Sequence, residues 1–346
     1  MTMKNLKIQY VLSFFTIASI FVSFLSSCSN DESDSISFDS PIINTVSRAE
    51  AGSLTPTTIG YANNMYIIQG SGFTTLEKIY FNDTDTYFNP TLVTDNNIFV
   101  TIDQNTPYEN GSNELIVVTK SGSAIHTFVV APPAPQMLRG FNPVNANEGD
   151  EITIYGNFFL DPIVTFGTTE AQVISNTLTD IVVKAPSGSD KQYITVTTIS
   201  GSVTSTYAVG TAIYDDVWYN GWDVASWNNH TYETDATASQ GTTYFKKNMG
   251  GWDNVQGEWG WDDQIADYGG IRMSLKGPDG SKIKLVFNGN WDDNTAPIID
   301  LTSEWKEYYF TWADLLNAGH VQNISFQEFT GNGGEYYFDN FGFFLK

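Results

Sequence analysis

The chain has 346 residues, with 39 acidic and 16 basic side chains and a formal net charge of −23. This length predicts about two or three domains, and an apolar content of 41% excludes a wholly disordered chain. The acidic balance argues against nucleic acids and anionic lipid headgroups as partners. With one cysteine and three histidines, the chain cannot form internal disulfides, cysteine-based zinc sites or histidine-rich metal sites.

Residues 1–27 have the pattern of a secretory signal peptide. Lys4 and Lys7 precede an uncharged apolar run over residues 10–25, which is shorter than the roughly 20 residues that a membrane-spanning helix needs. The run leads into the sequence Leu-Ser-Ser-Cys, which ends at Cys28 and resembles the bacterial lipobox. The resemblance implies that Cys28 becomes the first residue of the mature protein and carries a lipid anchor. The alternative is a stray cysteine after a cleaved signal.

The segment 28–40 is short, acidic and polar, which predicts a solvated tether without a core of its own. It resembles the surface-export signal of lipoproteins in glycan-degrading Gram-negative bacteria. The expected location is therefore the outer membrane, on the cell surface.

Residues 41–210 repeat one pattern, and the match between 66–73 and 152–159 shows it best. Each copy has short alternating strands separated by Gly, Asn and Pro, which predicts two immunoglobulin-like sandwiches over 41–131 and 135–210. The glycine that both copies share, Gly70 and Gly156, predicts a positive φ or a close backbone approach at that position. The copies resemble IPT/TIG domains, whose pattern includes a G-x-[GN]-F turn and a closing strand after T-x-S-G. That family implies rigid spacer domains without catalytic residues.

Residues 211–346 differ in composition, because all nine tryptophans lie between residues 218 and 312. Runs of apolar and β-branched residues still predict strands. The expected strands are 271–276, 283–287, 296–301, 306–311, 323–328 and 336–344. A Pro-Asp-Gly turn at 278–280 predicts that the first two form a hairpin. The predicted fold class is all-β, with two immunoglobulin-like sandwiches followed by a jelly-roll β-sandwich.

Nine tryptophans exceed what the core of one such domain needs, and several lie among Gly, Asp and Asn, which suits a surface. The candidates for a binding surface are Trp222, Trp227, Trp252, Trp259, Trp261 and Trp291. An indole ring stacks on the apolar face of a pyranose, while nearby carboxylates and amides bond its hydroxyl groups. Core packing is the alternative for each ring; it is favoured for Trp305 and Trp312, and the two readings are balanced for Trp218.

The lipobox, tether, paired IPT/TIG-like domains and tryptophan-rich end together resemble a type-B surface glycan-binding protein of Sus-like polysaccharide-utilisation systems. The last domain resembles the xyloglucan/β-glucan-binding domain of those proteins. This resemblance implies non-catalytic capture of a neutral polysaccharide, with a TonB-dependent transporter, surface hydrolases and other surface glycan-binding proteins as partners.

Many carbohydrate-binding modules of this kind hold a structural calcium ion between a closing-strand aspartate and a carboxylate near the domain start. The resemblance implies Asp339 with Asp215 or Asp216 as ligands, because Ca²⁺ needs several oxygen atoms. Solvated or turn-capping carboxylates are the alternative. No other cofactor is expected.

A glycoside hydrolase or lyase is the main competing function, since two carboxylates across a cleft are sufficient for glycoside hydrolysis. Candidates beside the aromatic segments are Glu258, Asp262, Asp263 and Asp292. However, the sequence lacks the Glu-x-Asp-x-x-Glu motif of jelly-roll β-glucanases, a G-x-S-x-G elbow, an H-E-x-x-H motif and a P-loop. We therefore expect no enzyme. A structural adhesin is the third possibility, but it leaves the tryptophans unexplained.

Overall fold

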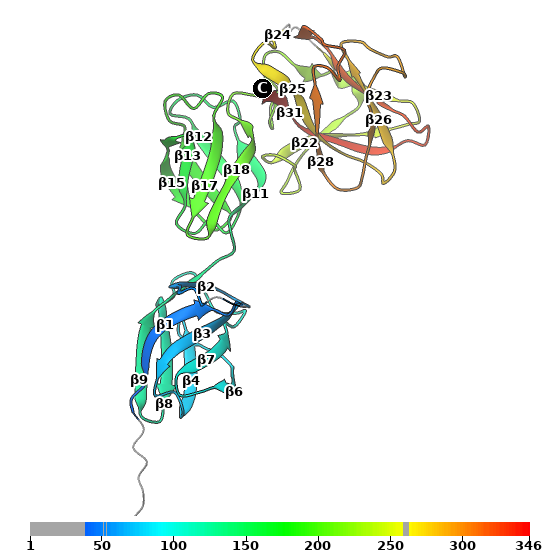
Figure 1. Ribbon diagram of the computed structural model, residues 1–346. Coiled ribbons are helices and arrows are strands. Elements are labelled where there is room, and N and C mark those ends of the chain that lie inside the picture. Colours follow the sequence, from blue (N-terminus) through cyan, green and yellow to red (C-terminus); the bar gives the residue numbers. More distant parts are fainter. Residues whose placement is uncertain (1–38, 51, 53, 259–262) are drawn as a thin grey trace, which may run out of the picture. The chain divides into compact units, whose positions relative to one another are not determined.

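The structure, a computed structural model, describes residues 39–50, 52, 54–258 and 263–346 (Figure 1). Cys28, the predicted leader and most of the predicted tether lie outside these residues. Strands predominate in the described chain, which confirms the all-β prediction. Within the described residues, no helix is long and apolar enough to cross a membrane.

Residues 42–131 form two four-stranded sheets and a short parallel pair. One sheet has the order β1 (Ile42–Arg48), β3 (Met65–Ser71), β7 (Asn97–Thr101) and β6 (Phe88–Val93). The other has the order β5 (Thr84–Asp85), β4 (Leu76–Phe81), β8 (Glu114–Thr119) and β9 (Gly122–Thr127). The parallel pair consists of β2 (Ile59–Tyr61) and β10 (Val129–Ala131). A core that includes Tyr66, Phe81 and Phe128 draws residues from both four-stranded sheets.

Residues 136–208 repeat this strand order. One sheet consists of β11 (Gln136–Asn142), β12 (Glu151–Asn157), β16 (Asp180–Lys184) and β15 (Gln172–Asn176). The other consists of β14 (Thr169–Glu170), β13 (Ile163–Phe166), β17 (Tyr193–Thr198) and β18 (Gly201–Ala208). The repeat seen in the sequence is therefore a repeat of strand topology.

The glycine shared by the two copies is explained by close packing of the backbone. A Cβ atom on Gly70 would lie 1.8 Å from the carbonyl oxygen of Ile42 on the neighbouring strand. At the matching position, a Cβ atom on Gly156 would lie 1.9 Å from the carbonyl oxygen of Gln136. Both glycines are needed because a neighbouring strand passes where a side chain would begin.

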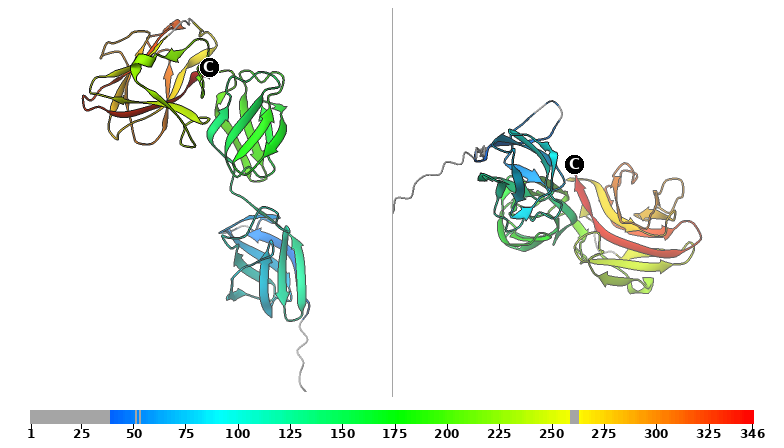
Figure 2. Two further views of the ribbon diagram at one scale, coloured as in Figure 1. Left: turned by 180° about the vertical axis from the view of Figure 1, so that it is seen from behind. Right: turned by 90° about the horizontal axis from the view of Figure 1, so that it is seen from below.

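The last part of the chain forms two larger sheets. The β31 sheet has the order β21 (Thr231–Thr234), β22 (Thr243–Met249), β31 (Gly334–Leu345), β25 (Tyr268–Lys276) and β28 (Lys306–Thr311), and β19 (Ala212–Tyr214) also pairs with β31. The β30 sheet has the order β20 (Asp223–Val224), β23 (Asn254–Glu258), β30 (Ile324–Glu328), β26 (Lys282–Phe287) and β27 (Ile298–Asp300). A short pair is formed by β24 (Asp263–Gln264) and β29 (His320–Val321). Figure 2 shows the long β31, in red, along one of these sheets.

The two sheets pack face to face around one apolar core. Phe338 of the β31 sheet and Phe326 of the β30 sheet have ring centroids 5.0 Å apart. Val255 and Leu285 add to this core from the β30 sheet, and Ile271 adds to it from the β31 sheet. A β-sandwich of this kind leaves each sheet with an outer face free to carry polar and aromatic side chains.

The predicted hairpin is wrong, although both of its strands exist. β25 pairs with β31 and β28, whereas β26 pairs with β27 and β30. The turn after Lys276 carries the chain from one sheet to the other, because Leu275 and Ile283 bury their side chains in the same core from opposite sides. Core packing, and not the local turn signal, decides the pairing.

Candidate functional site

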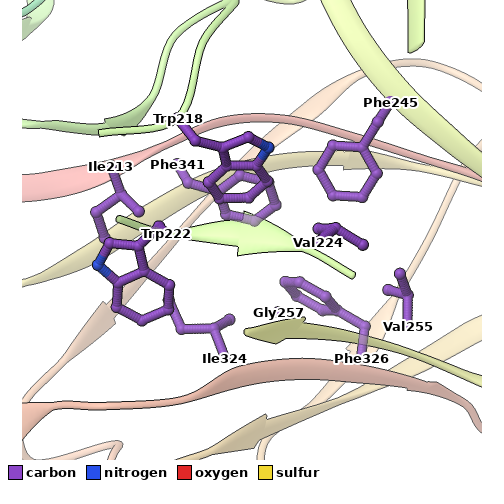
Figure 3. A pocket seen from close by; sticks show the side chains of 10 residues that line it. All are labelled: Ile213, Trp218, Trp222, Val224, Phe245, Val255, Gly257, Ile324, Phe326 and Phe341. Atoms are coloured by element: carbon purple, nitrogen blue, oxygen red, sulfur yellow. The ribbon is translucent and has the colours of Figure 1, made fainter. Parts of the chain in front are cut away.

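Trp222 is a core residue, so its prediction as a ligand-binding ring is wrong. Its side chain is only 3% exposed, and it packs with Ile213 and Ile324 (Figure 3). The Trp222 N–H donates to the carbonyl of Tyr219 at 3.0 Å and closes a turn. This turn exposes the polar neighbour Asp223, while the indole ring packs in the core.

Trp218 is half-buried and packs against the core of the sandwich. Its ring stacks on Phe341, with centroids 5.9 Å apart and planes 17° apart, and its Nε1–H donates to the Tyr232 hydroxyl at 2.8 Å. The cavity beside these rings measures about 20 Å³ and is lined by apolar side chains (Figure 3). A cavity of this size holds about one water molecule. It is a packing defect of the core and has no room for a sugar.

The outer face of the β30 sheet carries a row of polar side chains. Strand register places Asn254 opposite Gln327, Gln327 opposite Lys284, and Lys284 opposite Ile298. Directly paired residues share one face of a sheet. Since the next residues along these strands, including Val255, are buried in the core, this row faces outward. We call Asn254, Gln327 and Lys284 the polar strip.

Trp252 lies at one end of this outer face, just before β23. Its side chain is 56% exposed, and its ring meets the edge of Phe329 at a centroid distance of 5.5 Å. The residue has a φ of 65°, which is uncommon for a bulky side chain. A Cβ atom on Gly331 would lie 3.0 Å from the Trp252 Nε1 atom, so the ring lies directly over this glycine.

Glu328 lies beneath the Trp252 turn and is fully buried. One carboxylate oxygen accepts the backbone N–H groups of Trp252 and Gly331, each at 2.9 Å. The other accepts the Thr330 N–H at 2.8 Å, the Thr330 hydroxyl and the Tyr336 hydroxyl. Burial alone would raise the pKa of Glu328, but these hydrogen bonds outweigh it and lower the pKa below its ordinary value.

Trp291 lies on the other side of the same face, in the loop after β26, and is 42% exposed. Hydrogen bonds within the loop order it: Asn294 donates its backbone N–H to Asp292 at 3.0 Å, and Asn290 donates to Thr295 at 3.2 Å. Below the ring, the Lys284 ammonium lies 5.6 Å from its centroid and donates to the Trp291 carbonyl oxygen at 3.2 Å.

Trp227 belongs to the 3₁₀ turn η1 (Ser226–Asn228) at the edge of β23, and it is 56% exposed. The next residue, Asn228, is buried and fixes the turn to the strand. Its side chain donates to the Gln256 carbonyl oxygen and accepts the Gln256 N–H, both at 2.9 Å. Three of the predicted rings, those of Trp227, Trp252 and Trp291, are therefore exposed on loops anchored to the β30 sheet.

The remaining predictions near this face have different outcomes. Trp259 and Trp261 lie outside the described residues, as does Asp262. Asp292 accepts hydrogen bonds from the backbone and side chain of Asn294, which lower its pKa below the ordinary value. A general acid in a glycosidase needs the opposite shift. Trp305 and Trp312, expected in the core, are half-buried.

The two carboxylates predicted to bind calcium act as hydrogen-bond acceptors. Asp216 accepts the backbone N–H groups of Thr242 and Thr243 at 2.6–3.0 Å. Asp339 is fully buried and accepts those of Ser239 and Gln240 at 2.8 and 3.0 Å. Among the residues that the structure describes, no three His, Cys, Asp or Glu side chains gather around a possible metal position. These contacts do not favour calcium, and its binding stays a prediction.

The polar strip and its flanking rings have the chemistry of a carbohydrate site. Amide side chains of Asn254 and Gln327 offer both donors and acceptors to hydroxyl groups. Half-exposed indole rings on either side offer flat apolar surface. Sequence reasoning identified the rings but missed Gln327, Lys284 and Glu328. The signal for Lys284 was present, because a lysine inside the apolar run 283–287 must face away from the core.

Comparison with known proteins identifies the second sandwich. Residues 138–212 match the IPT/TIG domain family. The second sandwich is therefore similar to an IPT/TIG domain. The finding confirms the predicted resemblance for the second copy of the repeat. An IPT/TIG domain-containing protein of Bacteroides ovatus is 27% identical over 150 residues. That match covers 42% of this chain and 30% of the relative, so it spans less than a third of the relative's length.

Three solved structures of surface glycan-binding proteins align with most of this chain. PbSGBP-B from Prevotella bryantii is 14% identical, with a TM-score of 0.49, over 89% of this chain and 99% of that one. SGBP-B from a complex xyloglucan utilization locus in Bacteroides uniformis is 14% identical, with a TM-score of 0.36, over 89% and 100%. The mixed-linkage glucan SGBP-B of Bacteroides ovatus, solved with a heptasaccharide, is 16% identical, with a TM-score of 0.29, over 88% and 74%.

Proposed function

We propose that this chain binds a neutral polysaccharide, without cleaving it, on the outer face of the β30 sheet. The observation that carries the proposal is the placement of two half-exposed rings, Trp252 and Trp291, on either side of the polar strip. β23 and β26 are separated by one strand, so the ends of the strip lie about 10 Å apart. A glycan chain that crosses the strands can therefore stack on both rings and hydrogen-bond to Asn254 and Gln327 between them.

The charges of this face favour an uncharged ligand. Lys284 pairs with Asp293 at 2.7 Å, and Lys282 pairs with Asp300 at 2.8 Å. A uronate or sulfate group needs a cation, and both lysines of the described face already have a carboxylate partner. The net charge of −23 adds long-range repulsion of polyanions.

The ligand's identity, the lipid anchor and the cellular location are proposed from the resemblance of the chain's motifs to those of type-B surface glycan-binding lipoproteins. We propose β-glucan or xyloglucan as the ligand, lipidation at Cys28, and a position on the outside of the outer membrane. There the protein would capture polysaccharide for neighbouring hydrolases and a TonB-dependent transporter. Two or more acyl chains are needed for stable anchoring, and many anchored copies would raise avidity for a long polymer.

Affinity gel electrophoresis tests the proposal with the full chain from which only residues 1–28 are removed. The panel contains xyloglucan and mixed-linkage glucan, which are named for two of the similar structures, together with a neutral mannan and the polyanion alginate. We expect retardation by at least one β-glucan and none by alginate. Retardation by none of the neutral glycans would contradict the proposal and favour the adhesin.

A reducing-sugar assay on the same panel separates binding from hydrolysis. We expect no release of reducing ends over a day at micromolar protein. Release that disappears with Asp292→Asn or Glu258→Gln would identify the chain as a glycosidase and overturn the non-catalytic part of the proposal.

A further inference from the structure

Two charged side chains are buried directly behind the exposed rings of the proposed glycan face. The side chain of Lys284 is 5% exposed, and Glu328 is fully buried. Burying a charge is costly unless partners replace its water. Both side chains have such partners, and these partners belong to the turn and the loop that carry Trp252 and Trp291.

Lys284 connects the sheet to the Trp291 loop through three contacts. Its ammonium donates to the Trp291 carbonyl oxygen at 3.2 Å and to an Asp293 carboxylate oxygen at 2.7 Å. It also lies 5.6 Å from the centroid of the Trp291 ring and 5.1 Å from that of Phe329, within cation–π range of both. With these contacts and so little exposure, Lys284 has little opportunity to touch a ligand.

Glu328 connects the sheet to the Trp252 turn in a comparable way. Its carboxylate accepts the Trp252 N–H, and that residue has a left-handed φ that this hydrogen bond helps to maintain. The same carboxylate oxygen accepts the Gly331 N–H beneath the Trp252 ring. Within the described part of the chain, Glu328 is the side-chain acceptor of the Trp252 N–H, so removal of the charge weakens the turn directly.

We propose that Lys284 and Glu328 are positioning residues for glycan binding, each of which holds one tryptophan, Trp291 and Trp252 respectively. This inference rests on the proposed function. The two charges act on separate segments, the loop 288–296 and the turn 250–253. The hydrogen bonds of the two charges are not shared, but Phe329 contacts both the Lys284 ammonium and the Trp252 ring. Each charge therefore acts mainly on its own ring, and Phe329 is the contact through which Lys284 can also reach Trp252.

Double-mutant cycles test this pairing, with dissociation constants for the retarding β-glucan measured by calorimetry on the chain without residues 1–28. We expect Lys284→Met to weaken binding about tenfold when Trp291 is present and by less than about twofold in Trp291→Ala. Most of this tenfold effect should persist in Trp252→Ala, because only the contact with Phe329 connects Lys284 to Trp252. Glu328→Gln should show the reverse pattern, with its effect lost only in Trp252→Ala.

The strand provides a matched control for the lysine. Lys282 lies two residues earlier on the same face of β26 and pairs with Asp300, but its side chain is 45% exposed and its partner's 77%. Lys282→Met should leave affinity within about twofold of the parent, because an exposed ion pair contributes little. Lys284→Arg should restore most of the affinity, since the charge and the donors are kept.

Three outcomes would overturn the inference. A loss of affinity in Lys284→Met that is equally large in Trp291→Ala would make Lys284 a direct ligand contact. An equal loss of affinity in Lys282→Met would show that the effect comes from the positive charge of this face in general and not from the contacts of Lys284. Unchanged affinity in both Lys284→Met and Glu328→Gln would leave the rings positioned by other contacts. If Lys284→Met does not fold, Asp293→Asn repeats the test, because Asp293 is 64% exposed and removing its charge leaves the sheet intact.

A measurement without ligand separates this inference from the proposed function. Fluorine NMR of protein labelled with 5-fluorotryptophan, with signals assigned through Trp→Phe variants, reports on each ring. Lys284→Met should shift and broaden the Trp291 signal much more than the Trp252 signal, which it reaches only through Phe329, and Glu328→Gln should do the opposite. If no glycan binds but the signals move in this pattern, the proposed function fails while the positioning stands; signals that do not move contradict the positioning itself.

Discussion

The two outer faces of the terminal sandwich use aromatic rings in opposite ways. On the β31 sheet, the rings of Tyr244, Trp305 and Tyr337 surround the ammonium of Lys276, at centroid distances of 6.0, 5.0 and 4.4 Å. The Trp305 Nε1–H donates to the Thr237 carbonyl at 2.6 Å. On the β30 sheet, the rings flank amide side chains and keep about half of their surface exposed.

The comparison shows that the number of rings says little about binding. The rings around Lys276 have a cation within 6 Å of each centroid and pack against one another, which leaves less of them for a ligand. Trp252 and Trp291 are 56% and 42% exposed. Aromatic clusters of the first kind stabilise a fold, whereas rings of the second kind offer surface to a partner.

The largest effect that we expect is a pH dependence of stability on the β31 side. Asp215, which follows β19, accepts the Val144 N–H, and its burial raises its pKa to about 7. Burial also raises the pKa of Asp339 in β31. A carboxyl group with a raised folded pKa stabilises the fold fully below its unfolded pKa of about 4, and this stability is lost as pH rises towards 7. The loss is on the order of 4 kcal/mol at most for Asp215.

Thermal unfolding between pH 5 and 8 in EDTA checks this expectation. The midpoint should fall as pH rises, and Asp215→Asn should flatten the curve, while glycan affinity should not follow this trend. Burial lowers the pKa of His230, so this residue makes the fold less stable as pH falls below about 6.5. The decisive result is therefore the difference between the parent and Asp215→Asn, and not the slope of the parent curve alone. Added calcium serves as the test of the metal prediction: a midpoint that rises with Ca²⁺ and not with Mg²⁺, and loses that rise in Asp216→Asn, would establish a calcium site.

The next effect separates the two faces by mutation of one ring. Trp305→Ala removes a half-buried indole, its hydrogen bond to Thr237 and two ring contacts, and we expect a loss of about 2 kcal/mol in the free energy of unfolding. Affinity for β-glucan should stay within about twofold. Chemical denaturation and calorimetry measure the two quantities on one sample. A large loss of affinity with unchanged stability would move the glycan site to the β31 sheet.

Changes on the β30 face should give the inverse result. Trp252→Ala and Trp291→Ala combined should weaken β-glucan binding by about 1–3 kcal/mol, since a stacked ring contributes about 0.5–1.5 kcal/mol. The unfolding midpoint should change by no more than about two degrees, because both rings are largely exposed. Trp227→Ala is measured beside this pair: a loss as large as that of Trp252→Ala extends the site along β23 to η1. A double variant that binds as well as the parent would contradict the assignment of this face.

These differences explain how far the sequence could be interpreted. The repeat, the glycines that pack against neighbouring strands and the all-β fold were predictable because each depends on local spacing. The fate of a tryptophan was harder to predict. Trp222 and Trp252 both follow glycines and precede aspartates, yet one is buried and the other exposed. The two turns precede different strands, β20 and β23. Whether each ring is buried depends on the side of the sheet towards which its turn directs it.

Strand pairing also could not be predicted from local sequence patterns. A Pro-Asp-Gly turn between two apolar runs favours a hairpin, but here the strands on its two sides join different sheets. For the same reason the polar strip could not be assembled from sequence. Its members lie on β23, β26 and β30, and only the register of these strands brings Asn254, Lys284 and Gln327 into one row.

The smallest effect concerns the two lysines that contact aromatic rings on opposite faces. Lys276→Met removes an ammonium from among three rings but leaves an apolar side chain of similar length to pack there. We therefore expect a cost of about 1 kcal/mol or less in unfolding free energy and no change in glycan affinity. Lys284→Met has the opposite signature, with affinity lost through the Trp291 loop. Should Lys276→Met also weaken binding, the two faces would be coupled through the core, and the view of one structural and one binding face would have to be given up.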